Sequence, residues 1–197
     1  MNVFIGVPKG ELAKDTMNYL KNVYGAEIPI DGRVYTIEKD GSIYRICNSR
    51  DIPRFVGTDF DFGITGKDNA EDERISGNES FGYLKDLGFS KGSIIFFGTG
   101  KRVPMSPRIV TSTYYPNIAY KYGKEIFGGE PEILVVRGAT EGYVPSIADV
   151  SLDSKFSGKT SKMNGLVELE EAMKTSAVLI GRRSLTMEDF EKALKTK

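Results

Sequence analysis

Short apolar runs alternate along the chain with segments whose apolar residues recur at helical spacing. The runs that predict strands are residues 3–7, 42–47, 60–65, 93–99, 108–113, 132–137, 150–153 and 176–181. Helical spacing covers residues 12–24 and 118–127, and a terminal helix is predicted over 186–196. Strands that alternate with helices in this way are typical of an α/β fold.

Turn residues sharpen the first part of this pattern. Gly25 predicts the end of the first helix, because glycine readily adopts the left-handed conformation found after helices. Strands are also predicted at 27–30 and 34–38. The Lys39-Asp40-Gly41-Ser42 segment predicts a hairpin turn before the next strand, since Asp-Gly accepts positive φ.

Polar residues give three further local predictions. Asp51 is expected to cap a short helix through residue 56, and Thr186 to cap the terminal helix. Residues 67–80 are polar and acidic without clear periodicity, which predicts a loop. The acidic run at 168–171 predicts a solvated face.

Composition removes several kinds of chemistry. The 197 residues include no histidine and one cysteine, so a Ser-His-Asp triad, a Cys-His pair, a histidine-bearing zinc site and an internal disulfide are excluded. Because 27 basic side chains balance 27 acidic ones, bulk nucleic-acid binding is not expected. Without a signal-peptide pattern or a long apolar run, the chain is expected to be cytoplasmic and to bind no membrane.

The first candidate cluster is Gly6-Val7-Pro8-Lys9-Gly10, where the first strand ends. Lys9 can place a point charge beside a phosphate, and Gly10 lets backbone amides approach closely. A strand-to-helix turn with a solvated lysine is the favoured explanation of these residues when they are taken alone.

The second candidate cluster runs from Asp149 to Thr160. Asp149 and Asp153 are predicted to bracket a strand end, and Ser157-Gly158-Lys159-Thr160 follows with a helix start near Thr160. Amides, hydroxyls and a helix N-terminus suit a phosphate, while the carboxylates could accept hydrogen bonds from sugar hydroxyls or help hold a hydrated divalent cation. This is no Walker motif, because Asp153 stands where that motif requires glycine. A polar surface turn is the alternative.

Other positions are weaker candidates. The junction at 63–68, which contains Thr65 and Gly66, could line a cleft or form a turn. Glu141 follows a strand, and open α/β sheets bind ligands beyond the carboxyl ends of strands. Cys47 is expected to be a small core residue rather than a nucleophile.

Taken together and in order, these segments resemble the ATP phosphoribosyltransferase family. The matching blocks are Ile5 to Leu12, Asp51-Ile52-Pro53, Asp61 to Gly66, Arg108 with Tyr115-Pro116-Asn117, and 157–160 with Asn164-Gly165-Leu166. Glu11 departs from the family's arginine, and Ser146 to Asp149 lies one residue closer to Glu141 than the family's Gly-Leu-Ala-Asp. The chain is therefore identified as a divergent member.

The resemblance implies an α/β, two-lobed architecture of the type II periplasmic-binding-protein kind, with a cleft between the lobes. Lobe I would hold residues 1–91 and 177–197, and lobe II residues 92–176 with the phosphoribosyl pyrophosphate loop. A chain ending at Lys197 is expected to be a short-form catalytic subunit. In the family this form is implied to work as an oligomer with a separate regulatory subunit related to histidyl-tRNA synthetase.

The reaction implied is transfer of phosphoribose from phosphoribosyl pyrophosphate to adenine N-1 of ATP, releasing pyrophosphate, the first step of histidine biosynthesis. Mg²⁺ on the pyrophosphate, assisted by Lys9, would stabilise the departing charge. The resemblance places the 5-phosphate on Ser157, Gly158, Lys159 and Thr160, and the ribose hydroxyls on Asp149 and Asp153. Glu141 is a catalytic candidate without an assigned role, and Gly10, Thr65 and Gly66 are nucleotide or cleft candidates. Protein ligands of the metal are not predicted.

Two other functions fit the same residues. A non-catalytic small-molecule-binding or regulatory protein on the same fold would explain Glu11. A phosphoribosyltransferase with another acceptor would use the same phosphate loop.

Overall fold

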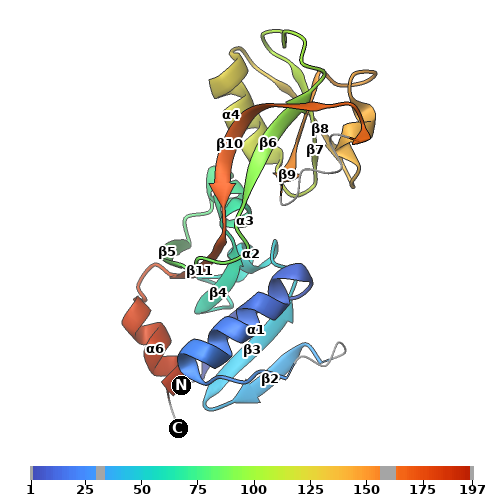
Figure 1. Cartoon of the computed structure of the whole chain (residues 1–197). Helices are drawn as coiled ribbons and strands as arrows, with labels where there is room; N and C mark the ends of the chain where they lie inside the picture. Colours follow the sequence, from blue (N-terminus) through green and yellow to red (C-terminus); the bar gives the residue numbers. More distant parts are fainter. Residues whose placement is uncertain (1, 30–33, 156–162, 196–197) are drawn as a thin grey trace. The chain divides into compact units, whose positions relative to one another are not determined.

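The computed structural model describes residues 2–29, 34–155 and 163–195, and it divides into two compact units. The first unit comprises residues 1–70, 77–90 and 176–197, and the second comprises 71–76 and 91–175. Each unit contains one β-sheet with helices packed on it (Figure 1). The predicted α/β class is confirmed.

The first unit is built on a six-stranded sheet with the order β2-β3-β1-β4-β11-β5. The strands are β1 (Val3–Pro8), β2 (Thr36–Lys39), β3 (Ser42–Cys47), β4 (Phe62–Gly66), β5 (Phe81–Asp86) and β11 (Ala177–Arg182). Strands β1, β3 and β4 run parallel, whereas β2 and β11 are antiparallel to their neighbours β3 and β4. The helices are α1 (Glu11–Tyr24), α2 (Ile52–Phe55) and α6 (Met187–Lys195), and α3 (Lys67–Ile75) begins in this unit.

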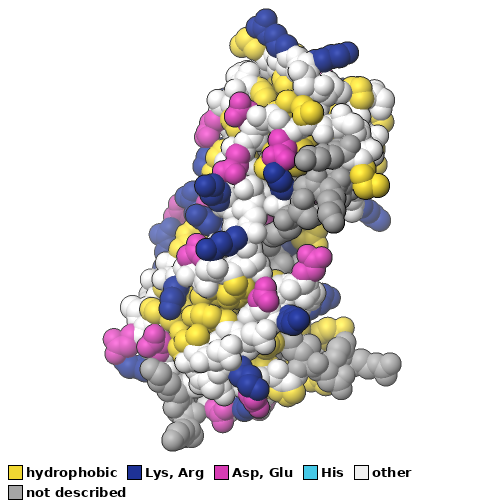
Figure 2. Space-filling model, in the orientation of Figure 1, with side chains coloured by type: hydrophobic (Ala, Val, Ile, Leu, Met, Phe, Trp, Pro, Cys, Tyr) yellow, Lys and Arg dark blue, Asp and Glu magenta, His cyan; other side chains and the backbone are white. Residues whose placement is uncertain are grey.

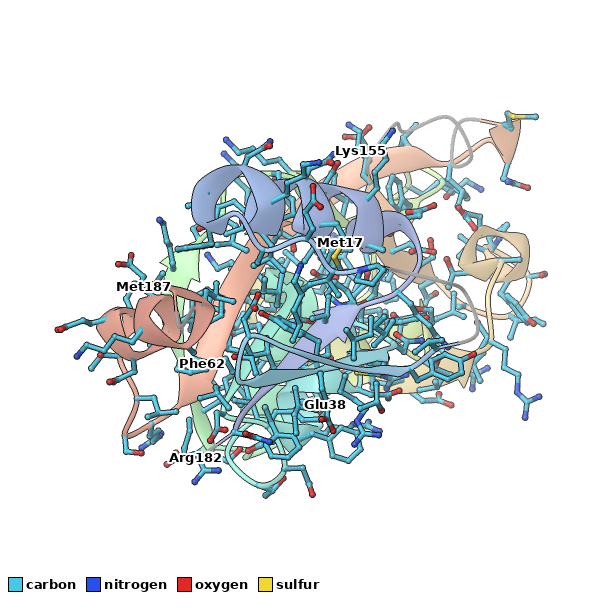
Figure 3. The ribbon with its side chains drawn as sticks, turned by 90° about the horizontal axis from the view of Figure 1, so that it is seen from below. Met17, Glu38, Phe62, Lys155, Arg182 and Met187 are labelled. Atoms are coloured by element: carbon cyan, nitrogen blue, oxygen red, sulfur yellow. The ribbon has the colours of Figure 1, made fainter. Side chains whose placement is uncertain are left out.

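Apolar contacts hold the helices of the first unit to its sheet. Leu20 of α1 is fully buried against a core that includes Ile5 of β1. Phe62 of β4, labelled in Figure 3, meets Phe190 of α6 edge-on with ring centres 5.2 Å apart. Ile52 of α2 packs so closely on β4 that a Cβ on Gly63 would lie 2.3 Å from the Ile52 Cγ2. Glycine at that position therefore permits the packing.

The second unit is built on a five-stranded sheet with the order β10-β6-β9-β7-β8. Its strands are β6 (Gly92–Gly98), β7 (Arg108–Ser112), β8 (Glu132–Val136), β9 (Val150–Lys155) and β10 (Val167–Thr175). Strands β8, β7 and β9 run parallel, and β6 and β10 continue the sheet antiparallel. Helix α4 (Pro116–Phe127) buries Ile118 in the core, and a short 3-10 helix, η1 (Thr140–Tyr143), follows β8.

Several local predictions are confirmed. Asp40 and Gly41 both have positive φ, 52° and 78°, and they connect β2 to β3 with Lys39 opposite Ser42. Gly25 ends α1 in the left-handed conformation, and its N–H donates to backbone carbonyls of the last turn. At α6, the Thr186 hydroxyl accepts from the Asp189 N–H while the Asp189 carboxylate accepts from the Thr186 N–H, a reciprocal capping box.

The prediction of a loop over 67–80 is wrong, because residues 67–75 form helix α3. The helix was missed because the side chains that it buries are polar apart from Ala70, so it has no apolar stripe. Asp68, Asn69, Glu71 and Asp72 are all buried, and Glu71 and Asp72 are bonded to specific partners. Hydrogen bonds of these polar side chains help to hold α3 in position, whereas apolar packing holds α1.

Other predictions also need correction. Residues 27–29 form no strand, and residue 30 lies outside the described residues. Asp51 precedes α2, but its side chain makes no capping hydrogen bond to this four-residue helix. Strands β5 and β10 were not predicted. The acidic residues at 168–171 are exposed as expected, but they lie on β10.

The charged side chains are mixed over the surface. On the face drawn in Figure 2, acidic and basic side chains are interspersed among the residues shown in colour. Among the described residues, no helix is both long and apolar enough to cross a membrane.

Candidate functional site

In the first unit, the carboxyl ends of three parallel strands bring the first candidate cluster and the 63–68 junction to the same edge of the sheet. Gly6 of β1 lies opposite Gly63 of β4, so the residues that follow each glycine leave the sheet at the same edge. Lys9 and Gly10 follow β1 there, and Gly66 ends β4. This is the edge at which parallel α/β sheets bind ligands.

Lys9 is exposed at this edge and is anchored through its backbone. Its N–H donates to the carbonyl of Cys47 at 2.8 Å, and its ammonium lies 5.9 Å from the centre of the Tyr35 ring. Gly10, with φ 81°, precedes α1, and no side chain of that residue can cap the helix. The uncapped N-terminus of α1 therefore begins beside a cation.

Thr65 and Gly66 differ in what they offer a ligand. Thr65 is fully buried and its hydroxyl donates to the carbonyl of Ser49 at 2.6 Å, so its proton is engaged within the protein. Gly66 is half-buried and leads into α3. Cys47 is half-buried, and burial raises the pKa of its thiol to about 11, which agrees with the expectation that it is not a nucleophile.

In the second unit, the parallel strands β7, β8 and β9 end at one edge. Ser112 of β7 lies opposite Val136 of β8, and Thr111 lies opposite Leu152 of β9, which sets Asp153 level with Ser112. The short helix η1 returns to this edge after β8 and carries Thr140 and the half-buried Glu141. The candidates Asp153 and Glu141 therefore belong to the same edge of the sheet.

The Asp153 carboxylate is held at both of its oxygens. Thr140 Oγ1 donates to Oδ2 at 2.9 Å, and the Ser154 N–H donates to Oδ1 at 2.7 Å. Thr140 is fully buried, whereas Asp153 is half-buried. The carboxylate is thus fixed in orientation and still partly open to solvent.

The prediction that Asp149 and Asp153 bracket a strand end is wrong. Asp149 precedes the first residue of β9 and Asp153 is the fourth residue of that strand. Four residue steps along an extended strand separate them, about 13 Å. Asp149 is exposed at the opposite edge, where its carboxylate accepts the Arg108 N–H at 2.8 Å.

The predicted phosphate loop follows directly from β9. Ser157, Gly158, Lys159 and Thr160 lie outside the described residues, which stop at Lys155 and resume at Met163. Lys155, labelled in Figure 3, ends β9 and forms an ion pair with Glu168 of β10 at 2.7 Å. Its charge is therefore shared with a carboxylate on β10, from which β9 is separated by β6.

Two residues of this unit were not found from the sequence. The sequence pattern does not single out Thr140, and it places Asp72 in a loop. Their partners, Asp153 and Asn117, are 13 and 45 residues away along the chain. A hydroxyl or carboxylate with so distant a partner leaves no periodic signal in the sequence.

The described residues contain no group of three or more aspartate, glutamate, histidine or cysteine side chains suited to hold a metal ion. A dedicated protein cage is thus not found in the part of the chain that the structure describes. Magnesium bound mainly through substrate phosphates needs only one or two carboxylates.

The two sheets with their parallel cores define a two-unit α/β protein of the periplasmic-binding-protein-like class. The structure of the arginine-, lysine-, histidine-binding protein ArtJ from Geobacillus stearothermophilus has this fold, with a TM-score of 0.54 at 12% identity, covering 99% of this chain and 88% of that one. The ATP phosphoribosyl transferase (HisG:HisZ) complex from Thermotoga maritima contains a chain with a TM-score of 0.78 at 18% identity, covering 99% and 100%.

Sequence comparison narrows the class to one family. The family described as HisG, ATP phosphoribosyltransferase, matches residues 48–196. The ATP phosphoribosyltransferase of Clostridioides difficile is 32% identical over 188 residues, which cover 91% of this chain and 88% of the relative. This chain belongs to the ATP phosphoribosyltransferase family.

Membership makes the chain a pentosyltransferase of the first step of histidine biosynthesis. The reaction moves phosphoribose from phosphoribosyl pyrophosphate to adenine N-1 of ATP and releases pyrophosphate. The alternative of a non-catalytic binding protein is not favoured.

Proposed function

We propose that the chain carries out this transfer with Asp153 as its ligand for the ribose hydroxyls. The observation that carries the proposal is the fixed orientation of the Asp153 carboxylate, at the edge of β9 from which the chain enters residues 156–162. A sugar bound by Asp153 would have its 5-phosphate near the Ser157 to Thr160 segment. Asp149 is the weaker candidate, because it lies at the other end of β9 with Arg108.

The remaining roles follow from the charge that the reaction moves. As the bond from the sugar carbon to pyrophosphate breaks, the carbon gains oxocarbenium character and negative charge collects on the departing oxygens. Lys9 would attract that charge, and the amides at the start of α1 beyond Gly10 would donate to it. No proton has to leave the acceptor nitrogen before attack, since N-1 of adenine already has a lone pair. Glu141, beside Thr140, remains a candidate without an assigned step.

Magnesium would enter with the pyrophosphate and neutralise part of its charge. No step proposed here depends on a metal ion bound by protein side chains. Thr65 and Gly66 stay candidates for the nucleotide side of the first unit, with the Gly66 backbone better placed than the engaged Thr65 hydroxyl.

A regulatory partner is also part of the proposal. The Thermotoga maritima structure is of a HisG:HisZ complex, and its chain covers the same length as this one. We propose that this chain is likewise a short-form catalytic subunit that assembles as an oligomer with a separate regulatory subunit in the cytoplasm, and that its two compact units are the two lobes of the enzyme.

Binding and turnover by two variants and their two matched controls test these roles. Asp153→Asn should weaken phosphoribosyl pyrophosphate binding about tenfold or more, because a charge-assisted hydrogen bond to the sugar is lost. Glu132→Gln is the matched control, since Glu132 is an exposed carboxylate at the opposite edge of the same sheet. Lys9→Met should lower kcat, whereas Lys14→Met, an exposed lysine of α1, should not. An Asp153→Asn protein with unchanged affinity would remove Asp153 from the site.

A further inference from the structure

The buried hydroxyl of Thr140 has one partner that matters for the reaction. Thr140 is fully buried, and its Oγ1 donates to Asp153 Oδ2 at 2.9 Å. The residue before it, Ala139, has φ 52° and ψ 47°. A left-handed conformation is unfavourable at a residue with a side chain, so the surrounding structure must hold the turn that positions Thr140.

We infer that Thr140 is a positioning residue that aims the Asp153 carboxylate at two neighbouring hydroxyls of the ribose. The inference rests on the proposed role of Asp153 and names the feature of the sugar that is recognised, its vicinal diol. Thr140 acts through Asp153 and does not itself touch the substrate.

The Asp153 carboxylate keeps hydrogen-bonding capacity for a ligand. An ionised carboxylate has about four acceptor positions, two on each oxygen. Thr140 occupies one position on Oδ2, and the Ser154 N–H occupies one on Oδ1, with the Ser154 hydroxyl more distant at 3.4 Å. The Thr140 hydroxyl on Oδ2 and the Ser154 N–H on Oδ1 stop rotation of the carboxylate. Oδ2 keeps a free acceptor position, and on Oδ1 the Ser154 hydroxyl is beyond the usual range of about 2.5–3.0 Å for an O–H···O bond, so a sugar hydroxyl can replace it. Two adjacent sugar hydroxyls can then each find an oxygen already in place, without the entropy cost of ordering it.

Removal of the Thr140 hydroxyl should therefore loosen sugar recognition and spare phosphate binding. Thr140→Val keeps the shape of the side chain and loses the donor, and Thr140→Ser keeps the donor. Thr111→Val is the matched control, because Thr111 is also fully buried in the second unit but donates to the backbone carbonyl of Leu152. The probes are phosphoribosyl pyrophosphate, ribose 5-phosphate, 2-deoxyribose 5-phosphate and inorganic phosphate, measured by calorimetry on the full chain.

We expect Thr140→Val to weaken phosphoribosyl pyrophosphate binding about five- to tenfold, an effect of the size of one ordinary hydrogen bond, because the substrate must then order the carboxylate itself. Its preference for ribose 5-phosphate over 2-deoxyribose 5-phosphate should fall, while its affinity for inorganic phosphate stays. Thr140→Ser and Thr111→Val should behave like the wild type. In an Asp153→Asn background, adding Thr140→Val should change affinity no further, because the interaction runs through the missing carboxylate.

The opposite results separate the two claims. Wild-type affinity in Thr140→Val, an equal loss in Thr140→Ser, or an equal loss of inorganic phosphate would overturn the role of Thr140. If the Asp153→Asn variant binds phosphoribosyl pyrophosphate as tightly as the wild type, the proposed function of Asp153 itself is contradicted.

Discussion

Asp72 caps helix α4 through Asn117. Its Oδ1 accepts the backbone N–H of Asn117 at 2.9 Å and that of Ile118 at 2.9 Å, while its Oδ2 accepts the Asn117 side-chain amide at 2.9 Å. Tyr115, the residue immediately before α4, supplies no capping side chain. A carboxylate from α3 therefore satisfies the free N–H groups at the start of α4. This contact joins residues 71–76 to the second unit.

Replacing Asp72 by alanine should destabilise the second unit by about 2–4 kcal/mol, because buried N–H groups of α4 would lose their acceptor. Urea unfolding followed by circular dichroism measures the loss. Asp59→Ala is the control: the Asp59 side chain is exposed and its only hydrogen bond among the described residues is from the adjacent Thr58 hydroxyl, so its removal should cost about 0.5 kcal/mol or less. Equal costs for the two variants would show that the cap is not important.

Glu71 should make stability depend on pH. Burial would raise the pKa of its carboxyl, but the two hydrogen bonds and the charge of Arg74, at 2.8 and 2.9 Å, together with the charge of Lys121, hold the pKa below its usual 4.5. A depressed folded-state pKa adds stability above the unfolded-state value, and that stability is lost as pH falls through the folded-state pKa. Glu71→Gln should therefore be less stable than the wild type at neutral pH, and the difference should shrink below about pH 4. A difference of constant size from pH 7 to pH 3 contradicts this assignment.

The hairpin turn offers a test of backbone conformation alone. A Cβ on Gly41 would meet no atom within 4 Å, yet φ is 78°, so Gly41→Ala should cost about 1–2 kcal/mol from strain. Gly82 on β5 also has open space but no positive φ, so Gly82→Ala should be neutral or slightly stabilising. Thermal unfolding compares the two, and similar shifts for both would disprove the conformational explanation.

Cys47 should react slowly in the folded protein. Burial raises the pKa of its thiol to about 11, so little thiolate exists near neutral pH. Iodoacetamide should label it slowly in buffer at pH 8 and rapidly in urea, as followed by mass spectrometry. Rapid labelling in buffer would contradict the buried, protonated thiol.

The sequence was sufficient where apolar spacing set the structure. Helix α1 buries Leu20 and α4 buries Ile118, and both were predicted from their spacing. Helix α3 was not, because its buried face is polar apart from Ala70, and the partner of Asp72 is 45 residues away. Hydrophobic periodicity records burial of apolar groups, and it is silent about carboxylates that are buried as acceptors.

The same limit applies to the candidate site. The sequence placed Asp153 and Glu141 at strand ends, but it grouped Asp149 with Asp153, although Asp149 precedes the first residue of β9 and lies at the opposite edge of the sheet with Arg108. The role of Thr140 follows only from the structure, in which η1 places its hydroxyl within hydrogen-bond distance of Asp153. Family resemblance supplied the reaction, and the fold supplied which side chains are held ready for it.

The most direct test of the activity is pyrophosphate release. The chain is mixed with ATP, phosphoribosyl pyrophosphate and magnesium, alone and with a regulatory subunit of the kind in the Thermotoga maritima complex, and products are followed by mass spectrometry and adenine absorbance. The account predicts pyrophosphate and phosphoribosyl-ATP in equal amounts, with a rate that falls in Asp153→Asn and not in Glu132→Gln. No product under either condition, or a product only with an acceptor other than ATP, would contradict it.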